Sequence, residues 1–327
     1  MLARYLARSD RQHVGTLLEP MRVLAHIHTM NDAAVIEQLL DALRHQTRPP
    51  DAIIIVDNAS TDATLDKACS EGATIVRNCK NLGPSGAIRT GFEHALEHGF
   101  DWTWVLDADT VPEADALEKL LAFFEHLPPA QREQVCFLNG WPLNETGGIK
   151  LHPTSLERGR MRALPLVRVR EFTQCDFTMW SGCLFRMATV AKIGLPTADY
   201  VADMGEAEYG YRARQLGFTS YIVHSAVIHH DVGRDPGVAQ RLYHYGPIRL
   251  SLYETSPWRA YYSVRNMIYF WLYQYEPGGM APPLRGIVRS LATTLNFLVR
   301  PVSHRRHLIA CIRGIRDGLT RHMERRY

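Results

Sequence analysis

The sequence predicts an α/β fold in which a mostly parallel sheet is flanked by helices and followed by a C-terminal helical extension. Between residues 21 and 126, short β-prone runs alternate with helical patterns, and this alternation is typical of a parallel sheet with helices on both faces. The run 53–56 contains only Ile and Val, as expected of a strand buried on both faces. With 327 residues, of which 46% are apolar and 22% charged, the chain can bury a large core.

The elements of the first half are assigned in order. Strands are expected at 21–27, 53–56, 74–77 and 102–106, because these runs are rich in apolar and β-branched residues. The first helix ends near His45 and carries Ile36, Leu39, Leu40 and Leu43 at the spacing of a buried stripe. Further helices are expected up to Cys69, over 87–98, and from about Glu113 to about His126.

The strand at 102–106 ends in two carboxylates, Asp107 and Asp109, and Pro112 then stops it. In an open α/β sheet the carboxyl ends of the strands form the ligand crevice. If the chain stays extended, both carboxylates point to one side, where a hard divalent cation could bind their oxygens. The alternative is that these acids cap the helix that starts near Glu113.

Other strand ends carry polar residues that would meet the same crevice. Thr29 follows the first strand, and Asp57 is the last residue of the second, while the Ser and Thr after it fit a helix cap. The loop 78–86 has two glycines and two asparagines before a helix start, which suits phosphate, and Arg89 adds positive charge. A plain strand-to-helix connection explains this loop equally well.

The second half has fewer clear elements. A strand is expected at 135–138, and 139–170 reads as irregular. A later apolar strand ends in His229 and His230, and a neutral imidazole is a good third ligand for a divalent ion held by carboxylates. Glu208 and Arg212 stand four residues apart on a predicted helix, where they would form a structural ion pair.

Four segments in this order carry a family resemblance: VDNASTDAT, RNCKNLGPSGAIRTG, WVLDADTVP and GEAEYGYRARQLG. Together they resemble the inverting glycosyltransferases of family 2, which have the nucleotide-sugar-binding GT-A fold. The resemblance covers residues 21–231, with a weaker match in YYSVRN at 261–266. The DWTW lead-in at 101–104 is most similar to bacterial rhamnosyl- and galactofuranosyltransferases.

The resemblance implies a nucleotide-sugar site and a metal site. It implies Mn²⁺ or Mg²⁺ on Asp107 and Asp109, with His229 as a further ligand, or His230 if the register is shifted by one. The segment around Trp180 would lie beside the sugar and the acceptor, although a core tryptophan fits equally well. The implied donor-binding residues are Thr29, Asp57, Asn58, Asn81, Gly83, Arg89, Asp107 and Ala108, and the implied sugar- and acceptor-binding residues are Trp180, Ser181 and Gly182.

The resemblance also implies a catalytic base, because inverting transfer needs a group that takes the proton from the acceptor hydroxyl. Family members carry a pair of acids before x-(D/E)-Y-G-x-R, and the second acid is the base. Here the pair is Gly205-Glu206, which assigns Glu206 as the base and leaves Asp203 as a rival.

The implied function is metal-dependent, inverting transfer of a sugar from a UDP- or dTDP-linked donor to a glycan or polyprenyl-linked acceptor. Two alternatives stay open. A nucleotidyltransferase would need a Gly-rich loop after the first strand, which HTMND does not provide. A nucleotide-sugar-binding or scaffolding protein without activity is compatible with Gly205 in place of an acid. The Q-x-x-R-W signature of processive synthases does not occur.

The chain is expected to comprise an N-terminal extension (1–20), a catalytic domain (21–237) and an aromatic, basic helical region (238–327). Residues 280–327 contain ten arginines and two acidic residues, and apolar helices with arginines are expected over 287–300 and 308–319. These helices suit an anionic membrane surface, although a helical cap on the catalytic domain also fits. Nothing in this region resembles a nucleic-acid-binding motif.

Two observations concern localisation. The six cysteines form no CxxC pair, which favours free thiols in a reducing compartment. No apolar run reaches the length of a spanning helix, and the first twenty residues lack the apolar core of a secretory signal. We therefore expect a cytoplasmic protein, or one held peripherally at the inner face of the cell membrane.

Overall fold

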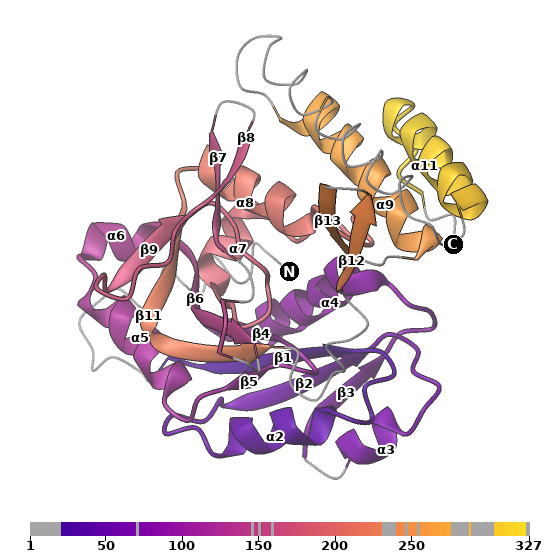
Figure 1. Cartoon of the computed structure of the whole chain (residues 1–327). Coiled ribbons are helices and arrows are strands. Elements are labelled where there is room, and N and C mark those ends of the chain that lie inside the picture. Colours follow the sequence, from indigo (N-terminus) through magenta and orange to yellow (C-terminus); the bar gives the residue numbers. More distant parts are fainter. Residues whose placement is uncertain are drawn as a thin grey trace.

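The structure is a computed structural model that describes residues 21–69, 72–144, 147–149, 152–157, 160–230, 240–245, 248–253, 256–275, 288 and 304–324. It has the expected α/β fold, built on a nine-stranded sheet (Figure 1). Along the sheet the strands are β3 (Thr74–Arg77), β2 (Ala52–Asp57), β1 (Val23–Thr29), β4 (Trp102–Asp107), β10 (Leu184–Arg186), β6 (Val135–Asn144), β11 (Thr219–His230) and β5 (Val111–Pro112). The ninth strand, β9 (Phe172–Cys175), pairs with β11.

The parallel part of the sheet is the part that the alternating pattern predicted. Strands β1, β2, β3 and β4 are parallel neighbours, and β6 is parallel to β11. The short strand β10 runs antiparallel between β4 and β6. The carboxyl ends of β1, β4 and β11 therefore point in the same direction and can supply one site.

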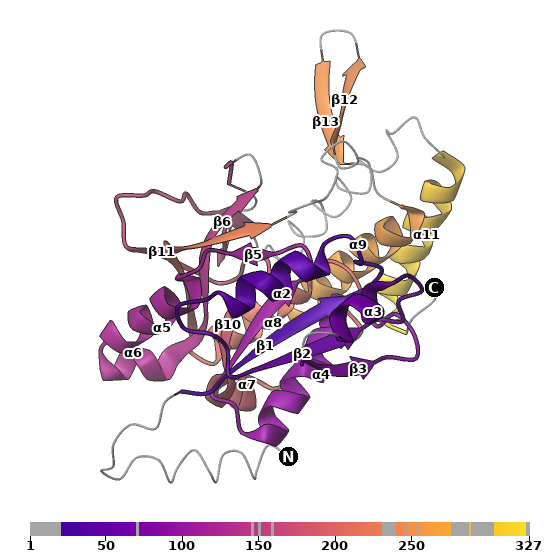
Figure 2. The ribbon, with the colours of Figure 1, turned by 90° about the horizontal axis from the view of Figure 1, so that it is seen from below.

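Helices cover both faces of the sheet, as Figures 1 and 2 show. On one face α2 (Ile36–Arg44) and α5 (Ala116–His126) pack against the odd-numbered apolar residues of β1. On the other face lie α4 (Gly83–His98), α7 (Met187–Ile193) and α8 (Gly205–Gln215). The predicted stripe of α2 is confirmed, because Ile36, Leu39, Leu40 and Leu43 are fully buried. Two short helices complete this region, α3 (Thr64–Ala68) and α6 (Pro129–Gln134).

Three elements differ from the sequence-based expectation. Pro112 was expected only to stop the preceding strand. Residues 111–112 instead form a short edge strand, β5, because they pair with Ile228 and His229. Strand β6 extends to Asn144, since it lies between β10 and β11 and is buried along almost all of its length. The segment expected to be irregular also contains a hairpin, β7 (Thr154–Glu157) and β8 (Arg160–Ala163).

The C-terminal region was expected to be helical, but it begins with an antiparallel hairpin formed by β12 (Gln240–Tyr245) and β13 (Ile248–Tyr253). The aromatic segment forms α9 (Pro257–Tyr269), which continues as a π-helical turn over Phe270–Gln274. The predicted helix 308–319 lies within α11 (His304–Leu319). Apart from Val288, the predicted helix 287–300 lies outside the described residues, as do residues 1–20 and the proposed boundary at 237.

Helices α9 and α11 pack side by side through Ala260, Val264, Ile268 and Cys311 (Figure 1). None of the helices in the described ranges has the length and apolar content required to span a bilayer. All six cysteines are free thiols, as expected.

Candidate functional site

Two carboxylates and one imidazole meet at the carboxyl end of the sheet. Asp107, Asp109 and His230 each offer a ligand atom, and these atoms all lie within 4.8 Å of one another. The Nε2 atom of His230 is 3.0 Å from Asp107 Oδ2 and 3.7 Å from Asp109 Oδ1. A tight turn brings Asp109 back beside Asp107, because the Thr110 amide donates to the Asp107 carbonyl at 3.0 Å. This mixed oxygen and nitrogen set can hold a divalent metal ion.

His229 does not join this cluster, which corrects the first choice of imidazole ligand. Its Nε2 atom lies 3.5 Å from a carboxylate oxygen of Glu113 instead. Successive residues of a strand face opposite sides, and the pairing of β11 with β6 is irregular between Val223 and Val227. Such an irregularity changes which of the two histidines faces Asp107 and Asp109. The structure has His230 in this position, as expected for a register shifted by one.

Asp107 is also held by His28, a residue that the sequence reasoning missed. His28 Nε2 lies 2.9 Å from Asp107 Oδ1, and the two residues are neighbours in the register of β1 and β4. Burial raises the pKa of Asp107, but His28 and His230 outweigh this effect and keep the pKa well below its usual range. Burial lowers the pKa of His28, but the charge and hydrogen bond of Asp107, together with the charges of Asp32 and Asp109, outweigh this effect and raise the pKa. The signal in the sequence was a histidine just before the strand-end Thr29.

A polar pocket lies next to this cluster. Six of the residues assigned to the donor line it, together with Asp109. The pocket residues that were predicted are Thr29, Asn58, Asn81, Gly83, Asp107, Ala108 and Asp109, and those that were not are His28, Met30, Asp32, Pro84 and Trp258.

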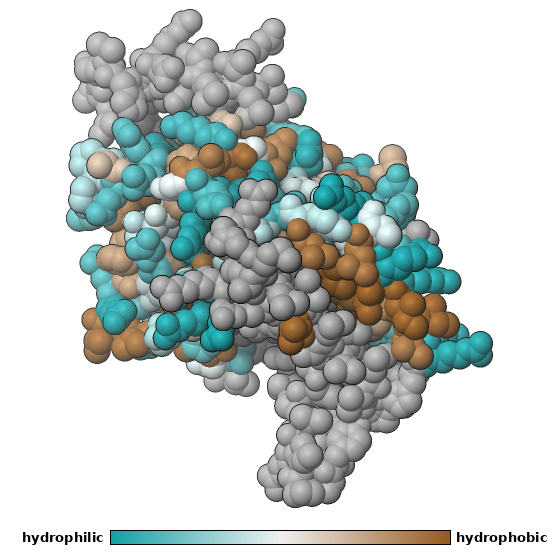
Figure 3. All heavy atoms as spheres, turned by 90° about the horizontal axis from the view of Figure 1, so that it is seen from above, coloured by the Kyte–Doolittle hydropathy of each residue, from teal (hydrophilic) through white to brown (hydrophobic). Residues whose placement is uncertain are grey.

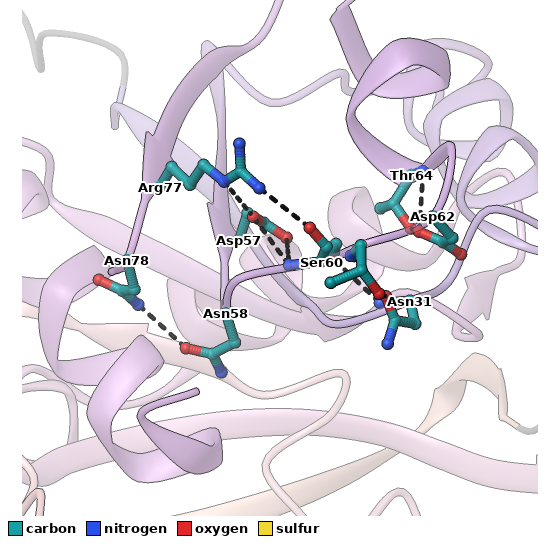
Figure 4. A network of polar contacts seen from close by, with 9 residues as sticks. Asn31, Asp57, Asn58, Ser60, Asp62, Thr64, Arg77 and Asn78 are labelled. Atoms are coloured by element: carbon teal, nitrogen blue, oxygen red, sulfur yellow. Dashed lines mark hydrogen bonds and ion pairs between the residues drawn. The ribbon is translucent and has the colours of Figure 1, made fainter. Parts of the chain in front are cut away.

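Asp57 and Arg89 are not among the lining residues. Asp57 is fully buried, accepts hydrogen bonds from the Ser60 amide and lies 3.4 Å from the Arg77 guanidinium (Figure 4). It therefore holds the turn that follows β2. Arg89 pairs with Glu93 at 3.1 Å along α4.

Asn58 connects this turn to the loop before α4. Its side-chain oxygen accepts from Asn78 Nδ2 at 3.0 Å, which Figure 4 shows, and from the Leu82 amide at 3.2 Å. The loop ends at Gly83, whose φ is +68°, and a Cβ there would lie 2.2 Å from the Val201 carbonyl oxygen. Only glycine permits this close approach, so the chain can start α4 at the pocket wall.

The segment of Trp180, Ser181 and Gly182 does not line the pocket but contacts the turn that carries Asp107 and Thr110. Trp180 is buried and packs edge-on against Phe185 and Tyr209, which agrees with the alternative of a core tryptophan. The Ser181 hydroxyl accepts from the Asp107 amide at 2.9 Å and pairs with the Thr110 hydroxyl. Gly182, with φ +86°, leaves no room for a Cβ beside Asn139.

Glu206 lies in the first turn of α8 with a strongly shifted pKa. Burial raises this pKa to about 7, and the charges of Asp203 and Asp107 add to the effect, while Arg259 opposes it. A carboxylate with a pKa near neutrality is well suited to accept a proton. The Gly205 that replaces the first acid has a packing reason, because a Cβ there would lie 2.5 Å from Ser85 Oγ on α4.

Asp203, the rival base, is engaged in other contacts. Its Oδ1 atom lies 2.7 Å from Arg259 Nη2, and its other oxygen accepts from the Ser263 hydroxyl, both on α9. Asp203 and Met204 have positive φ angles of 53° and 67°, so the turn before α8 adopts a conformation that is unfavourable for non-glycine residues. Asn266 Nδ2 donates to the Ala202 and Asp203 carbonyls and holds this turn in place. Asp203 is thus engaged by α9, and neither Asp203 nor Glu206 is among the residues that line the pocket.

The helix pair predicted within α8 is present, since Arg212 Nε lies 2.5 Å from Glu208 Oε1. Arg212 also donates to the Ile193 and Leu195 carbonyls, so this pair joins α8 to the end of α7. Its role is structural, as expected.

The chain is similar to known glycosyltransferases in sequence and in fold. The chain is 28% identical over 244 residues to galactofuranosyltransferase GlfT1 of Mycobacterium tuberculosis, an alignment that covers 70% of this chain and 75% of that protein. It is 33% identical over 106 residues to an undecaprenyl-phosphate mannosyltransferase of Micrococcus luteus, covering 31% of this chain and 43% of that protein.

Solved structures of GT-A glycosyltransferases share the fold. Residues 1–349 of S. aureus TarS match with a TM-score of 0.56 and 14% identity, covering 93% of this chain and 82% of that one. The mannosyltransferase PcManGT from Pyrobaculum calidifontis, solved with GDP-Man and Mn²⁺, matches with a TM-score of 0.52 and 15% identity, covering 94% and 81%. The chain spans about half (55%) of the GalNAc-T7 chain solved with UDP, GalNAc and Mn²⁺, with a TM-score of 0.56 and 14% identity over 84% of this chain. The model of the glycosyl transferase family 2 matches residues 25–188, and the chain belongs to this family.

Proposed function

We propose that this protein is an inverting, metal-dependent glycosyltransferase that uses a UDP- or dTDP-linked sugar. The observation that carries the proposal is the cluster of Asp107, Asp109 and His230 at the edge of a polar pocket at the carboxyl end of the sheet. Thr29, Asn58 and Asn81 would bind the nucleoside in this pocket. A divalent cation held by the cluster would neutralise charge on the diphosphate leaving group.

The chemistry assigned to the chain's own residues is a single displacement. Glu206 takes the proton from the acceptor hydroxyl as its oxygen forms a bond to the anomeric carbon. The bond from that carbon to the diphosphate oxygen breaks on the opposite face, so the anomeric configuration inverts. A base with a pKa of about 7 is largely deprotonated at the start of this step in mildly alkaline solution.

The relatives guide the choice of substrates. They include galactofuranosyltransferases and a protein named undecaprenyl-phosphate mannosyltransferase. For this chain we propose transfer of galactofuranose, rhamnose or a related hexose to a glycan or polyprenyl-linked acceptor in cell-envelope synthesis. We also propose that residues 21–237 form the catalytic unit, that 238–327 are appended to it, and that nucleic acid is not a partner.

Helix α11 supports an additional proposal, that the protein associates peripherally with the inner face of the cell membrane. One side of α11 packs on α9, as a helical cap would. The outward side exposes Leu308, Ile309, Ile312 and Leu319 between the exposed residues Arg305, Arg306, Arg313 and Arg316. An apolar stripe flanked by arginines is the composition that binds anionic bilayers.

The decisive experiment is a calorimetric titration with UDP and with dTDP, with and without Mn²⁺, on the wild type and on Asp109→Ala. We expect one nucleotide to bind in a metal-dependent way, and the variant to bind it at least tenfold more weakly, because one of the two cluster carboxylates is lost. If neither nucleotide binds under any condition, the strand-end acids are structural caps and the proposal is wrong. If the wild type binds a nucleotide sugar but neither transfers nor hydrolyses it, the protein is a binding or scaffolding protein.

A further inference from the structure

Helix α9 contributes one residue to the pocket that no sequence motif assigned. The other lining residues lie between His28 and Asp109, in the amino-terminal half of the chain, whereas Trp258 lies in the first turn of α9. The pocket is otherwise mainly polar, and Trp258 is the largest apolar side chain among its lining residues. Trp258 is only partly buried, so its ring has a surface available to a ligand.

The position of Trp258 is fixed by the core of α9. Its ring packs edge-to-face on Tyr262, with 5.1 Å between the centroids, and Tyr262 is fully buried. The guanidinium of Arg265 lies 4.7 Å from the Tyr262 ring centre and donates to the Met323 carbonyl at 3.0 Å. The Ser256 hydroxyl caps the helix by accepting from the Arg259 amide at 3.2 Å. A side chain supported in this way contacts a ligand at low entropic cost.

The same turn of α9 lies on the side of the proposed base. Arg259, the next residue, binds Asp203, which is three residues before Glu206. The charge of Arg259 also lowers the pKa of Glu206, so these groups are near one another. Trp258 therefore lines the pocket that would hold the nucleotide, and its neighbour Arg259 contacts the turn that precedes the proposed base.

We propose that Trp258 is a carbohydrate-stacking residue whose indole ring contacts a sugar ring, either of the donor or of the acceptor. This inference rests on the proposed glycosyl transfer. A pyranose or furanose has one face of C–H groups that packs on an aromatic ring, and its hydroxyls stay in contact with polar groups at the edge. The nucleobase is a less suitable partner, since the residues proposed to bind the nucleoside come from β1, the end of β2 and the loop before α4.

The test compares Trp258→Ala, Trp258→Phe and the wild type in four measurements. These are the Kd of UDP and dTDP, the Kd of UDP-galactofuranose and dTDP-rhamnose, the rate of donor hydrolysis without acceptor, and the KM for octyl galactofuranoside and octyl rhamnoside. A donor contact predicts that Trp258→Ala weakens sugar-nucleotide binding at least tenfold and leaves nucleotide binding unchanged. An acceptor contact predicts unchanged donor binding and hydrolysis, with acceptor KM raised at least tenfold. In both cases Trp258→Phe should stay close to the wild type in the affected constant, because a phenyl ring can also stack on a sugar.

Tyr269→Ala is the matched control, because Tyr269 is a partly exposed aromatic residue at the other end of α9 and does not line the pocket. Melting temperatures of all variants show whether α9 stays folded. The inference is overturned if Trp258→Ala changes none of the four measurements more than Tyr269→Ala does, or if it weakens nucleotide and sugar nucleotide equally, which would indicate stacking on the base. A wild type that binds no nucleotide overturns the proposed function and this inference with it.

Discussion

At the scale of single residues, the environment of Glu206 predicts a specific pH dependence. A base must be deprotonated, and the pKa of Glu206 is about 7. We expect kcat/KM to rise with pH and to level off above the pKa of Glu206. This pKa should be about 7 or lower in the loaded enzyme, because a bound divalent cation would lower it. Replacing Glu206 with Gln should reduce transfer by about 10²-fold or more and abolish this rise with pH, while nucleotide binding measured by calorimetry is retained.

Stability distinguishes a catalytic loss from unfolding in this variant. The folded-state pKa of Glu206 is raised from 4.5, so its stabilising contribution is complete below pH 4.5 and is lost as the pH rises through about 7. Gln carries no charge at any pH, so Glu206→Gln should melt no lower than the wild type at pH 8. Full transfer activity in this variant would exclude Glu206 as the base, and Asp203→Asn would then be the next variant to measure.

The two neighbouring histidines at the end of β11 allow a matched comparison. His230 lies within ligand distance of Asp107 and Asp109, whereas His229 contacts Glu113 on the other side of the strand. His230→Ala should weaken Mn²⁺ binding by about 10-fold or more, because the cluster loses an imidazole ligand. His229→Ala should leave it within about twofold. Titration of Mn²⁺ by calorimetry or by its EPR signal measures both, and equal effects would contradict the assigned register.

At the residue scale, the sequence predicts that carboxylates and an imidazole form the site. It is less successful in predicting which particular residues supply them. Asp107 and Asp109 follow from a strand end and a turn, which are local signals. The choice between His229 and His230 depends on an irregularity in the pairing of β11 with β6, which only the folded sheet determines. His28 reaches Asp107 because β1 and β4 are adjacent, and a single sequence does not state that pairing.

At the scale of elements, the contact between α9 and α11 depends on two glycines. A Cβ on Gly314 would lie 2.7 Å from the Tyr261 carbonyl oxygen, and one on Gly318 would lie 2.8 Å from that of Arg265. These neighbours are backbone atoms of a helix and cannot move separately. Gly314→Ala should therefore destabilise the protein by about 1–3 kcal/mol despite the higher helix propensity of Ala.

The control for Gly314→Ala is Arg306→Ala, which replaces an exposed residue of the same helix. Chemical denaturation should show a lower midpoint for the glycine variant alone. An unchanged midpoint would mean that α11 can move away from α9 without cost. In that case the proposed support of Trp258 by this helix pair would also weaken.

Local patterns explain why the first half of the fold was predictable and the second half was not. In β1 to β4 and their helices, the hydrophobic period changes clearly from strand to helix. Strands β5 and β10 have two and three residues and exist only through pairing with β11, β4 and β6. The hairpin at the start of the C-terminal region was hidden by an aromatic and basic composition that favoured helices.

At the scale of the whole molecule, the pocket and the outward face of α11 are joined through α9. Trp258 of α9 lines the pocket, and the opposite side of the helix pair is the exposed side of α11. Figure 3 views the molecule from the side on which α9 and α11 lie in Figure 1, and it shows apolar and hydrophilic side chains in adjoining patches. If the outward face of α11 binds a membrane as proposed, α9 would lie between the bilayer and the pocket.

The last prediction tests this arrangement by flotation with vesicles. The wild type should bind vesicles that contain phosphatidylglycerol and release them at high salt, because the attraction of arginines to anionic lipid is screened. Changing Arg305, Arg306 and Arg313 to Gln should weaken partitioning by about two orders of magnitude, at about 1 kcal/mol for each basic residue. Arg160→Gln with Arg162→Gln removes exposed arginines from the β7–β8 hairpin and should have no such effect. Equal binding of all three proteins would mean that α11 serves only as a cap, and the acceptor would then have to reach Glu206 from solution.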